Sequence, residues 1–553
     1  MRNRITYFFY VGFLMMLASC GISKSQKHQP DLSAYNNTKP VVTKLSDSVF
    51  IAGKNSLLKN KQGIWELYAE GDPLEIGLNT GALTDSLLKK QQQIFFSKIG
   101  DIVPSKFQQK LLRFFLKWYN RKLYLNVPDE YQAEIYGVSQ YTSHDLDNIA
   151  PPYQRGLYLH AAHDIGHALQ DLALVGCSSF AAWGDKSEDG NLILGRNFDF
   201  YVNDAFAENK IVAFIKPKEG HPFMMVTWPG MIGAVSGMNL EGLTITINAG
   251  KSEIPLSAKT PISILTREIL QHAATIDEAI AIAKKRKVFV SESIMIGSAH
   301  DNKAILIEVS PEKMDVYDVP NTDQLFCSNH FQSDAYKNDK RNMSQIANSH
   351  SEYRFEKLQE LFSQNPKINP KIASDILRNK DGLQNKALGY GNEKALNQFI
   401  AHHGIIFKPA SKQVWVSANP YQMGEFVCYN LDSIFMERKT KTLNSFEEEN
   451  LNIAKDPFLK TTAFLNFQKF KIEDDKIDLY LKNKTEISSE LIQNYQSLNP
   501  DYWVVYYKAG LYFYQKKSFK LARENFEKAL TKEITTVADK EAIEKYLKKI
   551  RRK

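Results

Sequence analysis

Cysteine is scarce in this sequence. Four cysteines occur in 553 residues, at Cys20, Cys177, Cys327 and Cys428. A protein stabilised by a disulfide framework needs several closely spaced pairs, so that class is excluded and the fold must depend on a hydrophobic core. Cys327 and Cys428 could pair in an oxidising compartment, but buried free thiols are at least as common.

Long hydrophobic runs are also rare, and the clearest one lies at the N-terminus. The chain is apolar from Ile5 to Leu17, after Arg2 and Arg4. Because this run is too short for a stable membrane span, residues 1–20 are expected to be an export signal. The ending LASC resembles the bacterial lipoprotein signal, which implies lipid attachment at Cys20; a chance cysteine is the alternative. No acidic cluster follows, which favours a lipid anchor in the bacterial cell envelope that faces the periplasm.

The chain has no strong charge of one sign. Its 70 basic and 62 acidic residues give a net charge of +8, spread along the chain except for a basic C-terminal end. This mild excess is typical of a solvated tail, and no nucleic-acid partner is expected. A contribution to binding at a membrane surface stays open.

A complete metal-binding motif is missing as well. His160, His163 and His167 in HAAHDIGHAL share one face of an expected helix and could in principle hold a metal ion. The HExxH pattern is not met, because Asp164 follows His163. Packed or hydrogen-bonded histidines are the commoner outcome, so we expect no metal and no cofactor.

The distribution of apolar residues divides the chain into segments. Residues 21–47 are polar and are expected to be a flexible tether. Residues 48–176 combine a strand near Ile64–Tyr68 with helices, and residues 177–440 contain short β-branched runs typical of antiparallel sheet, with helices between them. The helices expected before residue 177 are Leu87–Ile99, Phe107–Tyr124 and Asp129–Tyr141.

Residues 441–553 are expected to be helical. A helix pair at about 503–536 has the spacing of a tetratricopeptide (TPR) repeat. One repeat cannot bury both of its faces, so it must pack on the catalytic body, on flanking helices or on a protein partner. An ordinary amphipathic hairpin is the alternative. The residues with repeat spacing are Tyr506, Ala509, Gly510, Phe513, Ala522, Phe526 and Ala529.

The segment GCSSFAAWGDKSEDGNLILGRNFDF (residues 176–200) carries the clearest chemical pattern. Asp189-Gly190 is typical of a tight hairpin turn, and the return strand would place Arg196 and Asp199 beside Cys177. A nearby guanidinium lowers the pKa of a thiol. If the bond before Cys177 is cut, its new α-amine can act as the base at neutral pH. A buried structural thiol and a surface ion pair are the alternatives.

This hairpin resembles that of the acyl-coenzyme A:6-aminopenicillanic acid acyltransferase family of self-processing enzymes. It is also similar to the hairpins of choloylglycine hydrolases, acid ceramidase and N-acylethanolamine acid amidase. The resemblance implies an α+β fold, the N-terminal-nucleophile hydrolase αββα sandwich of antiparallel sheets. It further implies that the chain cuts itself between Gly176 and Cys177, and that the pro-segment (48–176) stays with the catalytic domain (177–440).

Three further residues match the family by resemblance. GMNLEGLTITINA matches a segment that ends in an oxyanion-hole asparagine, here Asn248, and CSNHF matches the segment with a second active-site asparagine, Asn329. Arg354 in EYRFEKLQEL matches a late active-site arginine. Strand-end turns would equally explain the two asparagines, and a solvated helix face would explain Arg354.

These observations predict a self-processing cysteine hydrolase. After self-cleavage, Cys177 would attack a linear N-acyl amide and form a thioester that water resolves, with Arg196 and Asp199 keeping the thiol and amine poised. Acyl transfer between amines, or from a thioester, is the first alternative, and a non-catalytic envelope binding lipoprotein is the second. The expected partners are the small-molecule amide, the retained pro-segment, the membrane through the lipid anchor and, through the C-terminal helices, a protein.

Overall fold

The computed structural model describes residues 21–103, 105–168, 176–200, 203–251, 257–436 and 444–552. The predicted export signal and Cys20, the predicted site of lipid attachment, lie outside the described residues. Within the described part, no helix is both long enough and apolar enough to cross a bilayer.

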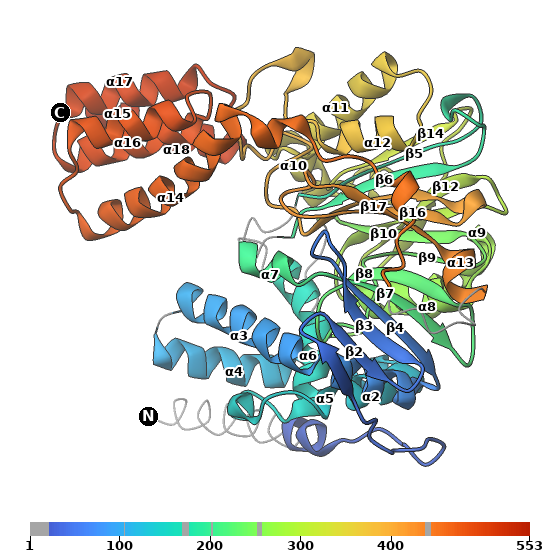
Figure 1. The fold of residues 1–553 in the computed structure, drawn as a ribbon. Coiled ribbons are helices and arrows are strands. Elements are labelled where there is room, and N and C mark those ends of the chain that lie inside the picture. The colour runs from blue at the N-terminus through green and yellow to red at the C-terminus, as the bar shows by residue number, and fades with distance from the viewer. Residues whose placement is uncertain are drawn as a thin grey trace.

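Two β-sheets form the centre of the described molecule (Figure 1). Counted over the described residues, the larger sheet has eleven strands in the order β1-β2-β3-β4-β7-β8-β9-β10-β11-β12-β13, and the smaller has six in the order β14-β5-β6-β15-β16-β17. The strands of the larger sheet are β1 (Thr43–Ser46), β2 (Val49–Ala52), β3 (Asn55–Lys59), β4 (Trp65–Gly71), β7 (Ile211–Pro217), β8 (Phe223–Thr227), β9 (Ser236–Asn239), β10 (Leu243–Ala249), β11 (Glu292–Ser298), β12 (Lys303–Val309) and β13 (Met314–Tyr317). Those of the smaller sheet are β5 (Ser178–Ala182), β6 (Ile193–Phe198), β14 (Gln324–Cys327), β15 (His403–Lys408), β16 (Gln413–Ser417) and β17 (Phe426–Asn430).

Alternating side chains let the larger sheet bury both of its faces. In β7, Ile211 and Ala213 join the core beneath two helices, whereas Val212 and Phe214 join the core between the sheets. A third core packs the smaller sheet against two further helices. The layers therefore run helix, sheet, sheet, helix, which confirms the predicted sandwich. The outer helices are α8 (Ile262–His272) and α9 (Ile276–Lys285) on the larger sheet, and α11 (Ser351–Gln364) and α12 (Pro370–Leu377) on the smaller.

One strand pair departs from the expected antiparallel arrangement. β4 runs parallel to β7, with Trp65 opposite Ile211 and Gly71 opposite Pro217. The connection between them is long and mostly helical, as a parallel pair requires. Because β4 precedes the predicted cut and β7 follows it, a continuous ladder of backbone hydrogen bonds joins the predicted pro-segment (48–176) to the predicted catalytic domain (177–440).

The helices before residue 169 follow the predicted pattern with shifted ends. The GDPLEIGLNTGAL segment forms α2, which begins where the Asp72 carboxylate accepts a hydrogen bond from the Glu75 N–H at 2.9 Å and Pro73 occupies the first turn. The helix expected to reach Tyr124 ends at Tyr119 instead. The helices are α2 (Pro73–Leu83), α3 (Asp85–Ile102), α4 (Lys106–Tyr119), α5 (Asp129–Ser139) and α6 (Pro152–Ala168).

The segment 21–47, expected to be a flexible tether, is partly ordered against the body. Residues 21–27 are helical, and the Gln154 side-chain amide of α6 donates hydrogen bonds to the carbonyls of Ser25 at 3.1 Å and His28 at 2.6 Å. Polar composition suggested disorder, but here polar groups of the segment pair with polar groups of the pro-segment helices.

The C-terminal helices form a bundle beside the sandwich (Figure 1). In the predicted repeat, α16 and α17 approach so closely that a Cβ on Gly510 would stand 2.6 Å from the Phe526 ring. The bundle does not stand alone, because Phe399 of the predicted catalytic domain shares a core with Phe467 and Tyr495. The helices are α14 (Thr462–Asn483), α15 (Ser489–Leu498), α16 (Trp503–Gln515), α17 (Phe519–Leu530) and α18 (Val537–Ile550).

A buried ion pair also joins the two sides of the predicted cut. Arg267 of α8 bonds both carboxylate oxygens of Glu134 of α5, at 3.0 and 3.2 Å, and both side chains are almost fully buried. Removing one partner leaves a buried charge uncompensated, so Arg267→Met is expected to lower the free energy of unfolding by about 3–5 kcal/mol. Urea unfolding would measure this loss. Adding Glu134→Gln should recover part of it; equal stability of Arg267→Met and wild type would contradict the prediction.

Candidate active site

The hairpin that carries the predicted site residues is formed by β5 and β6. Its register places Ser179 opposite Arg196 and Ser178 opposite Asn197, so the return strand runs beside the chain that leaves Cys177. The connection is longer than the predicted two-residue turn: residues 183–192 contain a 3-10 turn, and Gly190 adopts a positive φ of 76°. Asp189 instead forms an ion pair with Lys408 at 2.6 Å.

Cys177 is 1% exposed, and its Sγ lies 3.7 Å from a terminal nitrogen of Arg196. Burial raises the pKa of the Cys177 thiol to about 11, and this effect outweighs the opposing effect of Arg196. The predicted lowering of the thiol pKa is therefore wrong for the uncut chain, although the guanidinium acts in the predicted direction. Arg196 is held by the carbonyl of Val235 at 3.1 Å and the Ser236 hydroxyl at 2.6 Å.

Asp199 is fully buried at the end of the same strand. Burial raises the pKa of its carboxyl to about 7, while Arg354 and Arg196 act to lower it. Its backbone carbonyl also accepts a hydrogen bond from the N–H of Gly176 at 3.2 Å. Asp199 thus fixes the residue before Cys177 and carries a carboxyl that titrates near neutral pH.

A side chain that the sequence analysis missed contacts the predicted cleavage bond. The Nε2 of Gln398 donates to the Gly176 carbonyl oxygen at 2.6 Å. A Cβ on residue 176 would stand within 2.5 Å of the Gln398 amide, so only glycine permits this approach. Gln398 is separated from Cys177 by more than two hundred residues and matches no motif, so no signal in the sequence pointed to it.

Arg354 reaches the other side of the same residue. It donates to the Cys177 carbonyl at 2.5 Å, to the Ser178 hydroxyl at 2.7 Å and to the side-chain oxygen of Asn329 at 2.7 Å. The first turn of α11 carries it inward, and it is fully buried, so the solvated alternative is wrong. Burial lowers the pKa of Arg354 to about 10.

The two predicted asparagines are near the site but are already hydrogen-bonded. Asn248 donates to the carbonyls of Cys327 at 3.1 Å and Ser328 at 3.2 Å, and accepts from the Ser179 hydroxyl at 2.8 Å. The Asn329 amide donates to the Ala249 carbonyl at 3.0 Å. In the uncut chain, both N–H groups of the Asn248 amide are therefore engaged, whereas the Asn329 amide uses one of its two N–H groups in this bond.

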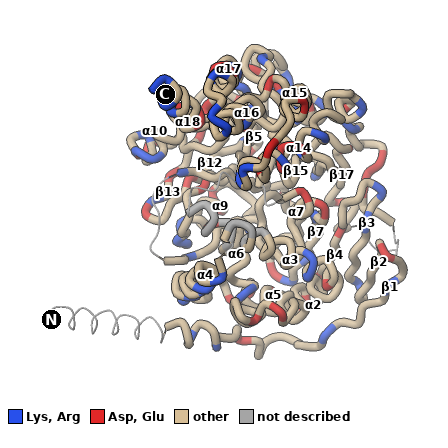
Figure 2. The backbone as a smooth tube through the Cα atoms, turned by 90° about the vertical axis from the view of Figure 1, so that its left-hand side faces the viewer, with Lys and Arg blue, Asp and Glu red and all other residues tan. Residues whose placement is uncertain are grey.

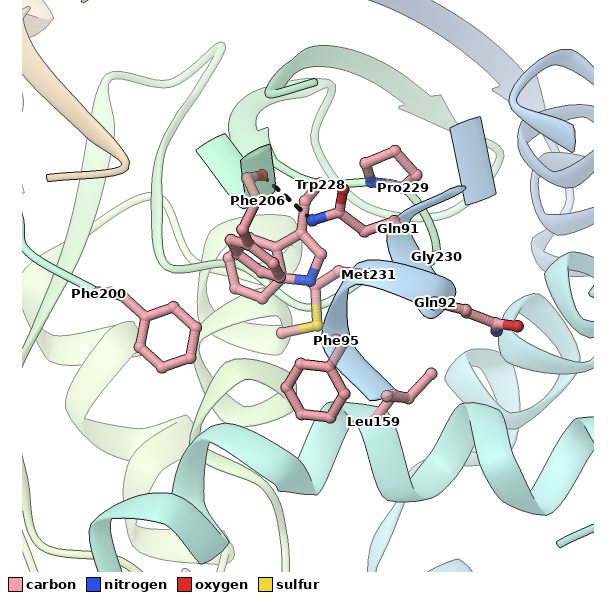
Figure 3. A pocket seen from close by; sticks show the side chains of 10 residues that line it. All are labelled: Gln91, Gln92, Phe95, Leu159, Phe200, Phe206, Trp228, Pro229, Gly230 and Met231. Carbon is pink, nitrogen blue, oxygen red and sulfur yellow. Dashed lines mark hydrogen bonds between the residues drawn. The ribbon is translucent and has the colours of Figure 1, made fainter. Parts of the chain in front are cut away.

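An apolar pocket lies close to the hairpin (Figure 3). The rings of Phe198 and Phe200 stack on Trp228 with interplanar angles of 7° and 10°. The Arg196 guanidinium lies 4.2 Å from the centre of the Phe198 ring. The cavity measures about 30 Å³, room for about one water molecule. Its lining, from α3, α6, the short helix α7 (Asp204–Glu208) and the segments after β6 and β8, is Gln91, Gln92, Phe95, Leu159, Phe200, Phe206, Trp228, Pro229, Gly230 and Met231.

His160, the first of the three helical histidines, is hydrogen-bonded through both ring nitrogens. Nδ1 bonds the Gly156 carbonyl at 2.8 Å, and Nε2 accepts from the Ile232 N–H at 2.9 Å. The side chains of His163 and His167 lie outside the described ones. Across the described residues, no group of three or more His, Cys, Asp or Glu side chains could hold a metal ion.

The two remaining thiols do not pair. Cys327 and Cys428 are buried and free. Cys327 is on β14 and Cys428 on β17, the two opposite edges of the smaller sheet, so no disulfide can join them.

Comparison with known proteins confirms the family resemblance. Residues 186–419 match the family model of acyl-coenzyme A:6-aminopenicillanic acid acyl-transferase. The match begins after Cys177 and includes Arg196, Asp199, Asn329 and Arg354. The chain therefore resembles this acyltransferase family over part of its length, and its described strand pairs are antiparallel apart from β4 and β7.

Three curated relatives are similar over part of their length. An uncharacterized protein of Archaeoglobus fulgidus is 25% identical over 280 residues, 46% of this chain and 45% of that protein. Protein dcd1B of Dictyostelium discoideum is 24% identical over 278 residues, 47% and 52% of the two chains. The N-acylethanolamine-hydrolyzing acid amidase of Caenorhabditis elegans is 23% identical over 211 residues, 36% and 57%. The chain thus spans about half the length of the curated relatives it matches.

Two solved structures are also similar. An N-acylethanolamine-hydrolyzing acid amidase ortholog of Caenorhabditis elegans is 18% identical, with a TM-score of 0.32 over 42% of this chain and 93% of that one. A mutant conjugated bile acid hydrolase of Clostridium perfringens is 12% identical, with a TM-score of 0.31 over 49% and 94%.

Proposed function

We propose that this chain is a self-processing cysteine amidohydrolase that cuts its own Gly176–Cys177 bond and then hydrolyses a linear N-acyl amide. One observation carries the proposal: the bond to be cut is held on both sides. Gln398 donates to the Gly176 carbonyl at 2.6 Å and Arg354 to the Cys177 carbonyl at 2.5 Å, while Arg196 lies 3.7 Å from the thiol sulfur.

Self-cleavage begins when the Cys177 sulfur, having lost its proton, attacks the Gly176 carbonyl carbon. The oxyanion that forms on the Gly176 oxygen keeps the hydrogen bond from Gln398, which strengthens as charge develops. The C–N bond then breaks, the Cys177 nitrogen takes a proton, and a thioester joins Gly176 to the sulfur. One water molecule hydrolyses this thioester, leaving a carboxylate on Gly176, a free thiol and a free α-amine on Cys177.

The same groups would then act on a substrate. The thiol gives its proton to the Cys177 amine, attacks the acyl carbonyl and expels the substrate amine, which leaves with that proton. Once the Gly176 carboxylate moves away, the Gln398 amide is free to hold the substrate oxyanion, whereas both N–H groups of Asn248 are bonded to backbone carbonyls in the uncut chain. Water then resolves the thioester to a carboxylic acid.

The apolar pocket supports a hydrophobic acyl group. Its lining includes Phe200, Phe206 and Trp228, and Trp228 stacks on Phe198, whose ring the Arg196 guanidinium covers, so a chain of aromatic contacts links the pocket to the arginine beside Cys177. The present cavity holds about one water molecule, so the acyl chain can enter only after the processing step or a side-chain movement enlarges it. A panel of N-acyl amides of increasing chain length, assayed with the cut protein, tests this assignment.

The carboxyl of Asp199 gives self-cleavage a defined pH dependence. The pKa of the Asp199 carboxyl is about 7, whereas that of the Cys177 thiol beside it is about 11. At neutral pH the ionised carboxylate is therefore available to accept the proton of the thiol. We expect the rate to rise about tenfold per pH unit below pH 7 and to level off above it. Asp199→Asn should cut more slowly and show no levelling, because only the thiol then titrates. Gels would follow the rate of self-cleavage of the wild type and of Asp199→Asn from pH 5 to 9. Identical dependence of the two rates on pH would contradict the role of Asp199 as proton acceptor.

A further inference from the structure

Helix α4 exposes an apolar stripe to solvent. The stripe begins at Phe107 and repeats at spacings of four and three residues, so its members lie on one face of the helix. Large apolar side chains at such exposure need a covering surface. The exposed fractions are 76% for Phe107, 60% for Leu111, 51% for Phe114 and 36% for Phe115.

A basic stripe runs beside the apolar one. It has the same spacing, offset by one residue, and α4 contains no acidic residue. Lys106 and Lys110 are exposed, and Arg113 and Lys117 are half-buried. Figure 2 shows basic segments along α4 on an outer edge of the molecule. The third face of the helix packs inward through Leu116 and Tyr119, so the exposed stripes are not needed for the fold.

We propose that α4 binds the surface of a bilayer with anionic headgroups. An apolar stripe of phenylalanine and leucine flanked by lysine and arginine matches a membrane interface, where the rings enter the acyl boundary and the cations meet lipid phosphates. A helix of 14 residues is about 21 Å long, enough to lie along the surface but not to cross it.

The N-terminal segment supports a bilayer as the occupant of this face. Gly21 lies against Arg121, two residues beyond the end of α4, since a Cβ on Gly21 would stand 3.4 Å from the Arg121 side chain. The guanidinium of Arg121 in turn stacks on Trp118 of α4, 4.5 Å from the ring centre. A lipid on Cys20, the residue before Gly21, would enter the bilayer beside this helix.

The same hairpin connects the surface to the apolar pocket. α3, which leads directly into α4, supplies Gln91, Gln92 and Phe95 to the pocket lining. Both helices extend away from the sheets on one side of the molecule (Figure 1). Docking through α4 would bring the pocket to the membrane, where amides with long acyl chains partition.

The test measures vesicle binding, which does not depend on self-cleavage. A chain lacking residues 1–20, which keeps every described element, is sedimented with vesicles of equal parts phosphatidylglycerol and phosphatidylcholine, or of phosphatidylcholine alone. The triple change Phe107→Ser, Leu111→Ser and Phe114→Ser is expected to weaken binding to the anionic vesicles at least about tenfold. Because all three side chains are exposed, the fold should be kept, and circular dichroism checks this.

A matched control removes as much exposed apolar surface elsewhere. Leu465, Ile472 and Leu479 of α14 are 53%, 60% and 55% exposed, and their change to serine should leave vesicle binding unchanged. If the parent chain binds vesicles of phosphatidylcholine alone more weakly than the anionic vesicles, this difference would support the role of the basic stripe. Absence of vesicle binding by the parent chain, or equal loss in both triple variants, would overturn the proposal. The proposal would also be overturned if the parent chain formed a dimer that only the triple change in α4 dissociates. The apolar stripe would then cover a second copy of the chain.

Discussion

A Cys177→Ala chain is expected to remain a single polypeptide under denaturing conditions, whereas the wild-type chain separates into two fragments, one beginning Cys-Ser-Ser-Phe. The alanine removes the sulfur that attacks the Gly176 carbonyl, so cleavage should be lost completely rather than slowed. Intact mass and N-terminal sequencing of both proteins measure the result. Under native conditions the two wild-type fragments should stay together, because β4 pairs with β7 across the cut.

Cys327→Ala is the matched control for this change. Cys327 is also buried and free, and it lies in the same sheet on β14, next to β5. This variant should cut as the wild type does. A wild-type chain that folds but stays intact would contradict self-processing and favour a binding lipoprotein. If the chain cuts, adding a second amine to the amidase assay separates acyl transfer from hydrolysis, because transfer yields a new amide.

Gln398→Ala is expected to slow self-cleavage by about 10²–10³-fold, the effect of removing one oxyanion donor. Gln398→Glu should slow it at least as much, since a carboxylate keeps the size of the side chain but repels the developing oxyanion. Cell-free synthesis followed by a time course on gels gives the rate, because the uncut chain is then visible from the start.

Gln332→Ala provides the comparison for Gln398. Gln332 likewise donates its Nε2 to a backbone carbonyl, that of Phe326 at 2.7 Å, but away from the cleavage bond. It should cut at the wild-type rate. If Gln398→Ala cuts as fast as Gln332→Ala while Cys177→Ala stays intact, self-processing would stand and the role of Gln398 would be wrong.

The position of Gln398 gives the C-terminal helices a structural role. The next residue, Phe399, packs on Phe467 of α14, with ring centres 4.7 Å apart. Earlier in the same segment, the Asn392 amide donates to the Glu533 carbonyl at 2.8 Å, and Asn499 exchanges hydrogen bonds with the backbone of Tyr390. The bundle therefore supports the loop that presents Gln398 to the Gly176 carbonyl.

Local patterns predicted most of the secondary structure, because periodicity depends on near neighbours in the chain. The helix predicted from Asp129 begins at that residue in α5, and the helix pair α16–α17 follows its repeat spacing. The errors occurred where long-range contacts override composition. In the polar segment 21–47, Ser25 and His28 are bonded to α6, and in the longer β5–β6 connection Asp189 pairs with Lys408 of β15.

The sequence by itself predicted the family resemblance, the layered fold that this resemblance implies and the hairpin that joins Cys177, Arg196 and Asp199, because a motif and its strand pairing are local properties. Only the tertiary structure decided the environment of these groups. Burial, which depends on the whole fold, raises the pKa of the Cys177 thiol that the hairpin alone would lower. Likewise, Gln398 reaches Gly176 only because distant segments pack together, and hydrogen bonds from Asn248 to distant carbonyls leave its amide unavailable.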